Sequence, residues 1–309
     1  MEHIFIITPA AGKTDCTSRI LAMAKDLRAR HGLTVSCILT KRPGHAAETC
    51  RGLLRQGGDY RFYACGGDGT VNEVASAIAG AENAAMTNIP TGTGNDFLKN
   101  FACQDRFADA EALWDGPQTA LDTIDCNGRL ALTVACCGFD AQIAADVHTY
   151  GRLPLLSHRG SYIASLGANF LLRGLGHRWA VTVDEERAEG DYTLAAVCNG
   201  RFYGGGFLPM PEARMDDGVL NALLVRKVSR LEFLRFVGPY SKGEYRRFPH
   251  AARAYTPKEL VIEGLEEDLT LCLDGEILSA RRAVLRLGAG KVQVFGPAEA
   301  FQQGPPVNL

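Results

Sequence analysis

The sequence lacks the features that mark several large classes of protein. Its 33 Lys and Arg residues are offset by 35 Asp and Glu, which leaves a formal net charge of −2. Nucleic-acid-binding domains carry a basic excess, so we expect no nucleic acid as a partner. No stretch approaches the roughly 18 continuous apolar residues of a membrane-spanning helix. The N-terminus, MEHIFIITPAAGK, has neither the basic segment nor the apolar length of a signal peptide. We expect a cytoplasmic protein that contacts a membrane only peripherally, at its inner face.

Disulfide and metal-binding cysteine patterns are also missing, although the chain has ten cysteines. No C-x-x-C occurs, and the adjacent Cys136 and Cys137 are too close in sequence to ligate one tetrahedral metal ion. Most of the others lie in apolar runs, such as Cys37 in VSCILT and Cys65 in FYAC. We therefore predict reduced thiols that act as small hydrophobic residues of the core.

What is present is an ordinary globular composition. Of the 309 residues 46% are hydrophobic and 22% charged, and the length favours two domains. In the first part of the chain, buried strand patterns alternate with helical patterns. The expected strands are 3–8, 34–40, 61–65 and 84–89, and the expected helices are 15–30, 45–56 and 71–79. This alternation predicts an α/β N-terminal domain over residues 1–122, a parallel sheet with flanking helices.

After residue 122 the pattern changes to short β-rich runs separated by turn residues. The runs are LALTVACC, RWAVTVD, YTLAAVCN, GVLNALLV, ELVIEG, LTLCLDGEIL, AVLRL and KVQVF. They predict a mainly antiparallel β-sandwich C-terminal domain over residues 123–296, with helical patterns near 160–173 and 230–238. The tail, 297–309, is expected to be loosely ordered and to pack back on the first domain. Because ligands of open α/β sheets bind beyond the carboxyl ends of the strands, we expect the functional cleft between the two domains.

A glycine-rich loop, GGDGTVNE, follows the expected strand 61–65. Gly66, Gly67 and Gly69 allow positive φ and close approach of backbone amides to an anion. The helix expected from Val71 adds its N-terminal dipole and free N–H groups, which together make a phosphate cradle. Asp68 would repel a bare phosphate, so its presence predicts that Mg²⁺ accompanies a nucleotide here.

A second loop, NIPTGTGNDFLKN, follows the next expected strand and has the same character. Two such loops on successive strands bring Asp68 and Asp96 to one edge of the sheet, which favours a metal–nucleotide complex. Both loops also have a ligand-free explanation. Thr70 and Glu73 fit the T-x-x-E pattern of a capping box, and Asp96 fits a helix N-cap.

Together, GGDGTVNE and PTGTGNDF resemble the diacylglycerol kinase catalytic domain family, soluble bacterial lipid kinases related to sphingosine kinases. NAD kinases are more distant relatives that share GGDGT. The segments LDTIDCNG, CCGFDAQIA, NGRFYGGGFLPMPEARMDDGVL and LDGE are similar to the family in the same order, over essentially the whole chain. One departure lies in ITPAAGK, where Thr8 replaces the family's Asn while Pro9, Gly12 and Lys13 are kept. Thr supplies a hydroxyl but no amide at this position.

The resemblance implies an ATP- and Mg²⁺-dependent lipid kinase that phosphorylates the hydroxyl of diacylglycerol, giving phosphatidic acid, or of a related lipid alcohol. It implies that Asp68, Asp96 and Asp122 organise the active-site Mg²⁺, largely through water. Asp274 is carried over as the general base, with Asp68 as its rival for that role. The implied nucleotide-binding residues are Thr8, Pro9, Ala10, Ala11, Gly12, Thr40, Gly66, Gly67, Asp68, Gly69, Thr70, Val71, Asn72, Thr93, Asn95 and Glu276.

A structural Mg²⁺ is also implied, held by Asp217 and by main-chain oxygens of Arg214 and Val219. Turn carbonyls beside a carboxylate are suitable hard ligands for such an ion. By pattern alone, however, the Asp-Gly pairs at Asp217 and at Asp274 are each typical of a tight turn, and the pair in LTLCLDGEIL is typical of a type I′ hairpin.

The lipid and membrane contacts rest on two segments of the second domain. The apolar face of 161–175 fits either a lipid groove or a helix packed on the core. Between Arg226 and Glu259 there are nine Lys or Arg against three Glu, with Tyr240, Tyr245 and Phe248 interleaved. This excess fits either an anionic membrane surface or a solvated face without a partner. The resemblance further implies a homodimer through the second domain.

Two other functions compete with the lipid kinase. A soluble-substrate kinase such as an NAD kinase is disfavoured by the GTGNDF loop, the GGG…DDG run and DGE. A nucleotide-binding module without catalysis is disfavoured because Asp68, Asp96, Asp122 and Asp274 are all present. The choice among diacylglycerol, a sphingoid base, phosphatidylglycerol and other lipid alcohols stays open.

Overall fold

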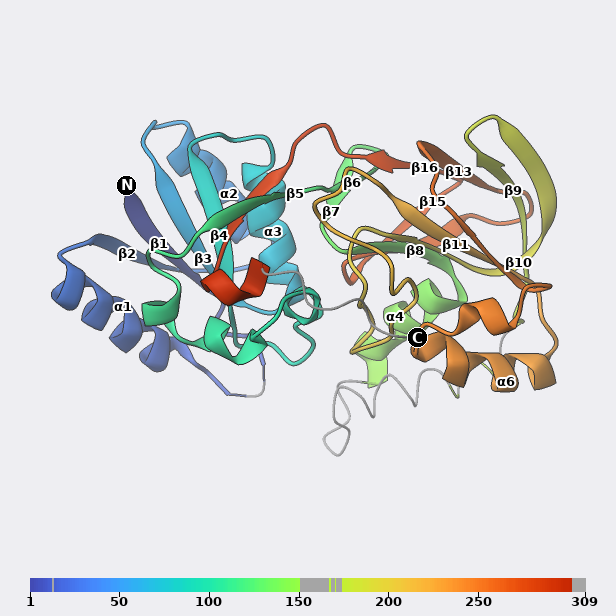
Figure 1. Ribbon diagram of the computed structural model, residues 1–309, viewed down its shortest axis with the longest axis horizontal. Coiled ribbons are helices and arrows are strands. Elements are labelled where there is room, and N and C mark those ends of the chain that lie inside the picture. Colours follow the sequence, from blue (N-terminus) through green and yellow to red (C-terminus); the bar gives the residue numbers. More distant parts are fainter. Residues whose placement is uncertain (13, 151–166, 168–169, 171–173, 302–309) are drawn as a thin grey trace. The chain divides into compact units, whose positions relative to one another are not determined.

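The computed structural model describes residues 1–12, 14–150, 167, 170 and 174–301. The chain forms two compact units (Figure 1). The first unit contains Met1–Asp122 and the described residues from Ala289 onward, and the second contains Thr123–Gly288. Most of the segment 161–175, including the helix expected at 160–173, lies outside the described residues.

The described part of the first unit is built on a six-stranded sheet in the order β2-β1-β3-β4-β17-β5. Strands β1 to β4 and β17 are parallel, and β5 runs antiparallel to β17. Helices cover the sheet, so β1, β3 and β4 are almost wholly buried. The α/β fold predicted from strand–helix alternation is confirmed. The strands are β1 Glu2–Ile7, β2 Thr34–Leu39, β3 Tyr60–Gly66, β4 Ala84–Pro90, β5 Gln118–Leu121 and β17 Val292–Phe295, and the helices are α1 Thr17–His31, α2 His45–Leu54 and α3 Asp68–Ile78.

The C-terminal strand β17 crosses back into the first unit. It was expected in the second domain, whose predicted range ended at residue 296, but the second unit ends at Gly288. Val294 pairs with Met86 of β4, and β17 is completely buried apart from Gln293. A short apolar strand reads alike in either domain, so only tertiary pairing decides where it belongs. Single-turn 3₁₀ helices complete this unit: η1 Leu98–Asn100, η2 Gln104–Ala108, η3 Ala110–Ala112 and η5 Ala298–Phe301.

The second unit is an antiparallel β domain, as predicted. Its described strands form one hydrogen-bonded network of eleven, with the path β15-β14-β8-β10-β9-β13-β16-β6-β7 and with β11 and β12 branching from β10. The strands are β6 Ile124–Cys126, β7 Arg129–Ala131, β8 Val134–Gly138, β9 His177–Val183, β10 Glu186–Cys198, β11 Asn221–Arg226, β12 Ala252–Tyr255, β13 Glu259–Gly264, β14 Leu269–Leu273, β15 Glu276–Ala280 and β16 Arg282–Leu287. The described helices are α4 Phe139–Tyr150, α6 Arg230–Ser241 and the 3₁₀ helix η4 Tyr245–Arg247.

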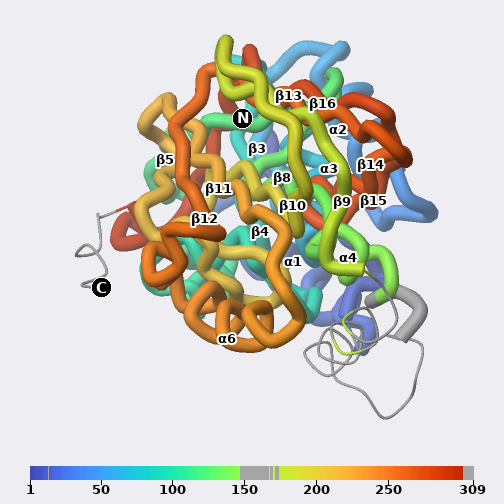
Figure 2. The backbone as a smooth tube through the Cα atoms, turned by 90° about the vertical axis from the view of Figure 1, so that its right-hand side faces the viewer, coloured from blue at the N-terminus to red at the C-terminus, as the bar shows by residue number. Residues whose placement is uncertain are grey.

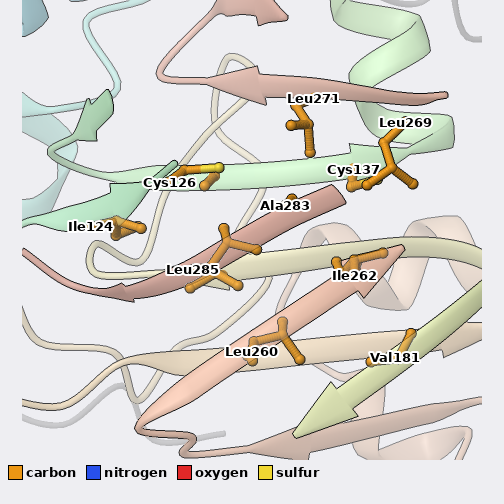
Figure 3. Packing of buried hydrophobic residues seen from close by; sticks show 14 of the residues in the cluster. Ile124, Cys126, Cys137, Val181, Leu260, Ile262, Leu269, Leu271, Ala283 and Leu285 are labelled. Carbon is orange, nitrogen blue, oxygen red and sulfur yellow. The ribbon is translucent and has the colours of Figure 1, made fainter. Parts of the chain in front are cut away.

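This sheet carries hydrophobic cores on both of its faces. Successive residues of a strand point to opposite faces, and on β8 the neighbours Cys136 and Cys137 belong to two different clusters. Figure 3 shows part of the cluster around Cys137, where Ile262 and Leu285 converge from β13 and β16. All ten cysteines are free thiols, and seven are buried. Within the described residues, no helix is long and apolar enough to cross a bilayer.

The capping box anticipated at Thr70 and Glu73 is not formed. Helix α3 begins at Asp68, so Glu73 lies in its second turn, too far along to cap it. Its carboxylate instead accepts N–H bonds from Gly44 at 2.7 Å and Ala46 at 3.0 Å, at the start of α2. A sequence motif for capping one helix thus serves the N-terminus of another.

Replacing Glu73 with Ala should destabilise the protein by about 2 kcal/mol, since charge-assisted bonds to half-buried helix-end amides are lost. Glu48→Ala, which removes only an exposed ion pair with Arg42, should cost about 0.5 kcal/mol. Urea unfolding of both variants measures the difference. Equal losses would mean that Glu73 does not stabilise α2.

Candidate active site

The sheet order of the first unit creates a switch point between β1 and β3. The chain leaves β1 toward β2 on one side and leaves β3 toward β4 on the other. In such sheets, ligands bind at the carboxyl ends of the strands that flank the switch. The loops that begin at Thr8 and at Gly67 both start there, and the Thr8 N–H donates to Cys65 O at 3.0 Å.

Three hydroxyl groups from three segments meet at this point. The Oγ1 atoms of Thr8 and Thr70 lie 2.9 Å apart, and Thr40 Oγ1 donates to Thr8 Oγ1 at 3.2 Å. All three residues were predicted to bind nucleotide. Thr8 directly follows β1, Thr40 directly follows β2, and Thr70 lies in the first turn of α3. The hydroxyl of Thr8, which stands where the resembling family has Asn, is the centre of this network.

The two glycine-rich loops are in direct contact. Asp68 Oδ1 accepts the N–H of Phe97 at 3.2 Å, which ties the first loop to the second. A Cβ on Gly94 would lie 2.8 Å from Asp68 Oδ2, and one on Gly92 would lie 2.5 Å from Gly67 Cα. Side chains at these two glycines would therefore push the loops apart. Asp68 thus contacts the loop that carries Asp96, while the convergence of the two carboxylates stays a prediction.

The glycines of the first loop serve close approach and not a left-handed backbone. Gly67 is extended, with φ −99° and ψ −166°, and neither Gly66 nor Gly69 has a positive φ. The freedom for positive φ that these glycines allow is not used, because the chain passes straight from β3 into α3. Gly66 is instead needed because a Cβ there would lie 2.1 Å from Thr70 Oγ1.

The N-terminus of α3 lies at the same place. The helix begins at Asp68, three residues before the expected start, and its N-cap Gly67 makes no side-chain capping bond. Val71 N–H already donates to Gly67 O at 3.1 Å, and the Val71 side chain is in the core. Val71 was predicted to bind nucleotide, but its side chain is buried and cannot contact a ligand. In general, the N-terminus of an α-helix is a place where anions bind, because its dipole and its first-turn N–H groups favour negative charge.

The other predicted nucleotide residues occupy the rims of these loops. Thr93 is exposed, and Asn72 lies in the second turn of α3, where its Oδ1 faces Ser76 at 3.4 Å. Ala11 N–H bonds back to Thr8 O at 3.0 Å, so the segment with Pro9 and Ala10 forms a tight turn. Gly12 follows it with φ 84°. Lys13 lies outside the described residues.

Lysines accompany two of the three aspartates predicted at the active-site Mg²⁺. Asp96 pairs with Lys99, and the buried Asp122 pairs with Lys291 at 2.8 Å. In the part of the chain that the structure describes, no group of three or more His, Cys, Asp or Glu side chains converges as a metal site.

Asn95 nevertheless supplies an oxygen that suits a cation. Its backbone is left-handed, with φ 50°, and its Nδ2 donates to Gly92 O at 3.0 Å. Its Oδ1 is buried and accepts no hydrogen bond. Buried acceptors without donors are rare, and a hydrated Mg²⁺ would satisfy this one. Asp68 and Asn95 therefore fit an oxygen-bound cation in character.

Asp274 lies in the second unit, at the tip of the β14–β15 hairpin. Asp274 and Gly275 have φ 47° and 96°, which confirms the predicted turn. The Asp274 carboxylate accepts N–H bonds from Leu132 at 2.5 Å, Thr133 at 3.0 Å and Val134 at 2.9 Å. No sequence signal announces these partners, which lie more than 130 residues away. The carboxylate thus holds the hairpin against the start of β8.

The remaining predicted residues of this unit have local partners. Glu276 is exposed on β15. Asp217 Oδ1 accepts the N–H of Val219 at 3.0 Å, as in an Asx turn, and the Arg214 guanidinium pairs with Asp216 at 3.2 Å. These contacts explain the turn without an ion, and the structural Mg²⁺ stays a prediction.

Comparison with known families explains both units. Residues 2–126 match the diacylglycerol kinase catalytic domain, and residues 133–296 match the YegS C-terminal NAD kinase beta sandwich-like domain. A "Probable lipid kinase YegS-like" from Pseudomonas aeruginosa is 32% identical over 241 residues, 75% of each chain. Another of that name, from Pseudomonas syringae pv. tomato, is 29% identical over 301 residues, 96% of this chain and 95% of its own.

This chain belongs to the YegS-like lipid kinase family. Membership of a kinase family implies use of ATP. A diacylglycerol kinase structure from Bacillus anthracis str. Sterne shares the fold, with a TM-score of 0.71 at 21% identity over 97% of this chain and 98% of that one. An NAD kinase from Archaeoglobus fulgidus in complex with ATP is a more distant fold relative, with a TM-score of 0.51 at 13% identity over 96% and 94%.

One buried polar cluster in this YegS-like kinase was not predicted as a site. It consists of the Asp140 carboxyl group, from the GFDA segment, and two tyrosine hydroxyls. Asp140, at the start of α4, bonds through Oδ2 to the hydroxyls of Tyr203 and of Tyr240, the latter at 3.1 Å. The two tyrosine hydroxyls lie 2.7 Å apart. Burial raises the pKa of Asp140 from 3.8 to about 6, although both hydrogen bonds oppose that shift.

Asp140 and Tyr240 of this cluster also line a small apolar pocket in the second unit. Asp140 and Tyr240 are its polar lining residues, and the rest of the lining is Ile143, Leu194, Phe207, Phe233, Phe236 and Val237.

We expect the pKa of Asp140 to make stability depend on pH. The folded protein holds this proton more tightly than the unfolded chain, so the contribution is present below pH 3.8 and is lost as pH rises through about 6. The loss amounts to about 3 kcal/mol. Relative to wild type, Asp140→Asn should become more stable between pH 4 and 7 in urea unfolding, whereas the exposed Asp26→Asn should show a constant difference. A constant difference for Asp140→Asn would contradict the shift.

Substituting Asp274 with Asn should cost about 1–3 kcal/mol of stability, because an amide leaves at least one buried N–H without an acceptor. Hydrogen exchange at Leu132, Thr133 and Val134 should speed up in this variant while exchange in β1 and β3 stays slow. Unchanged exchange at all three amides would show that the carboxylate does not hold them.

Proposed function

We propose that this protein transfers the γ-phosphate of ATP to the hydroxyl of a lipid, with diacylglycerol as substrate and phosphatidic acid as product. The observation that carries the proposal is the contact between the two glycine-rich loops at the switch point. There, Asp68 is held against Phe97 N–H beside the N-terminus of α3. The family to which the chain belongs supports transfer to a lipid.

The proposed roles follow from the local chemistry. The first-turn amides of α3 and the hydroxyls of Thr8, Thr40 and Thr70 would orient the phosphates. Asp68 and Asn95 would hold Mg²⁺, which neutralises charge on the phosphates when bound. As the lipid oxygen bonds to the γ-phosphorus and the bond to the β-phosphate oxygen breaks, the hydroxyl proton passes to a carboxylate and ADP leaves. Asp274 and Asp68 are the candidate acceptors.

Phosphate transfer from γ-labelled ATP to lipid alcohols in mixed micelles tests the proposal. The panel would contain diacylglycerol, a sphingoid base and phosphatidylglycerol, with NAD as a soluble control and EDTA to remove Mg²⁺. Labelled phosphatidic acid is expected. Asp68→Asn should reduce the rate by about 100-fold or more, as the loss of a proton acceptor or cation ligand does, while Asp26→Asn should leave it unchanged.

Each result has a defined meaning. If Asp274→Asn matches the loss in Asp68→Asn at a temperature where both are folded, both carboxylates act in the reaction; if it retains activity, Asp274 is structural. Label on another lipid would replace diacylglycerol as the substrate. Label on NAD alone, or none with ATP still bound, would overturn the lipid kinase.

A further inference from the structure

Helix α6 has two unlike faces. Phe233, Phe236 and Tyr240 point inward and are at most 4% exposed. On the opposite side, Leu231 is 61% and Leu234 is 58% exposed. The helix lies at the periphery of the second unit in both views of the backbone (Figures 1 and 2).

Exposed leucines of this kind are few among the residues that the structure describes. The large hydrophobic residues with substantial exposure are Met1, Leu21, Leu39, Val219, Leu231 and Leu234. Leu231 and Leu234 alone in this set share one helix, and their i, i+3 spacing makes them neighbours on its surface. The two side chains therefore form one small exposed apolar patch.

Cations lie along the same side of the helix. Arg235 follows Leu231 by four residues, a spacing that returns to the same helical face. Lys242 is the C-cap residue at the C-terminal end of α6, and both cations are exposed. The single acidic residue of α6, Glu232, lies off this face, and His250 Nε2 is 2.5 Å from its carboxylate. We call Leu231, Leu234, Arg235 and Lys242 the α6 outer surface.

The inner face of the same helix lines the apolar pocket that Asp140 also lines. Phe233, Phe236, Val237 and Tyr240 all contribute to that lining. A single helix therefore separates the pocket from the α6 outer surface. Leucines flanked by cations on an exposed helix match the boundary of an anionic bilayer, where apolar side chains enter and cations meet the headgroups.

We propose that the α6 outer surface docks this protein on an anionic membrane, with Leu231 and Leu234 inserted at the headgroup boundary and Arg235 and Lys242 over the lipid phosphates. The proposal rests on the proposed function, because a lipid substrate is what brings the enzyme to a bilayer.

Sedimentation with vesicles tests the docking separately from catalysis. The full chain would be mixed with phosphatidylcholine vesicles containing 30% phosphatidylglycerol, without ATP. Each cation at such a surface strengthens binding by about fivefold, so Arg235→Gln with Lys242→Gln should weaken it by about 30-fold. Leu231→Ser with Leu234→Ser should weaken it by about tenfold or more. Matched controls lie on the exposed side of α1: Leu21→Ser, and Lys25→Gln with Arg28→Gln, which should bind as wild type does.

Two further readouts separate the competing outcomes. Transfer to a short-chain diacylglycerol dispersed below its micelle concentration should be unchanged in the α6 variants. Because the vesicle assay contains no ATP, a failure of the lipid kinase proposal leaves the docking test intact. Wild-type vesicle binding in the α6 variants, or an equal loss in the α1 controls, would overturn the proposal. So would conversion of a dimeric protein to a monomer by Leu231→Ser with Leu234→Ser, since the surface would then join two copies of this chain.

Discussion

The contact between the two glycine-rich loops is the constraint on which the candidate site depends. Because Gly92 approaches Gly67 with no Cβ between them, the Asp68 carboxylate reaches the amide of Phe97. The parallel pairing of β3 with β4 brings the loops into range, and the absence of side chains lets them touch. The same loop also carries Asn95, whose Nδ2 donates to Gly92 O.

Carboxylates accept groups of backbone amides in both units. Glu73 accepts amides at the start of α2, and Asp274 accepts three amides at the start of β8. The start of α3 has no side-chain cap, although Glu73 belongs to that same helix. Glu73 and Asp274 thus hold the start of α2 and the start of β8, and neither caps α3. The dipole of α3 is directed at the switch point, where a phosphate would be bound.

The second unit contains a buried carboxyl group, Asp140, whose desolvation opposes folding. Asp140 loses hydration, and the two tyrosine hydroxyls restore only part of that loss, so its pKa remains raised to about 6. Fully buried carboxyl groups are rare in cores, and a shifted pKa beside a pocket marks a candidate functional group. The pocket lining shares α6 with the exposed leucines, which links the buried cluster to the surface through one helix.

The sequence by itself determined the two-part architecture and the location of the loops. Strand and helix periods are local properties, and so is the Asp-Gly turn at Asp274, since each depends on residues within a few positions. The family resemblance carried the function further than any single motif did. The binding residues that the resemblance implies stay predictions, because roles such as those of Asp122 and Glu276 depend on a bound nucleotide.

Only the tertiary structure decided the rest. The return of β17 to the first sheet, the use of Glu73 by α2, the three amides on Asp274 and the meeting of Asp140 with Tyr203 and Tyr240 all join residues far apart in the chain. Such pairs leave no periodic trace, because a carboxylate or a short apolar strand has the same local pattern whichever distant partner it meets.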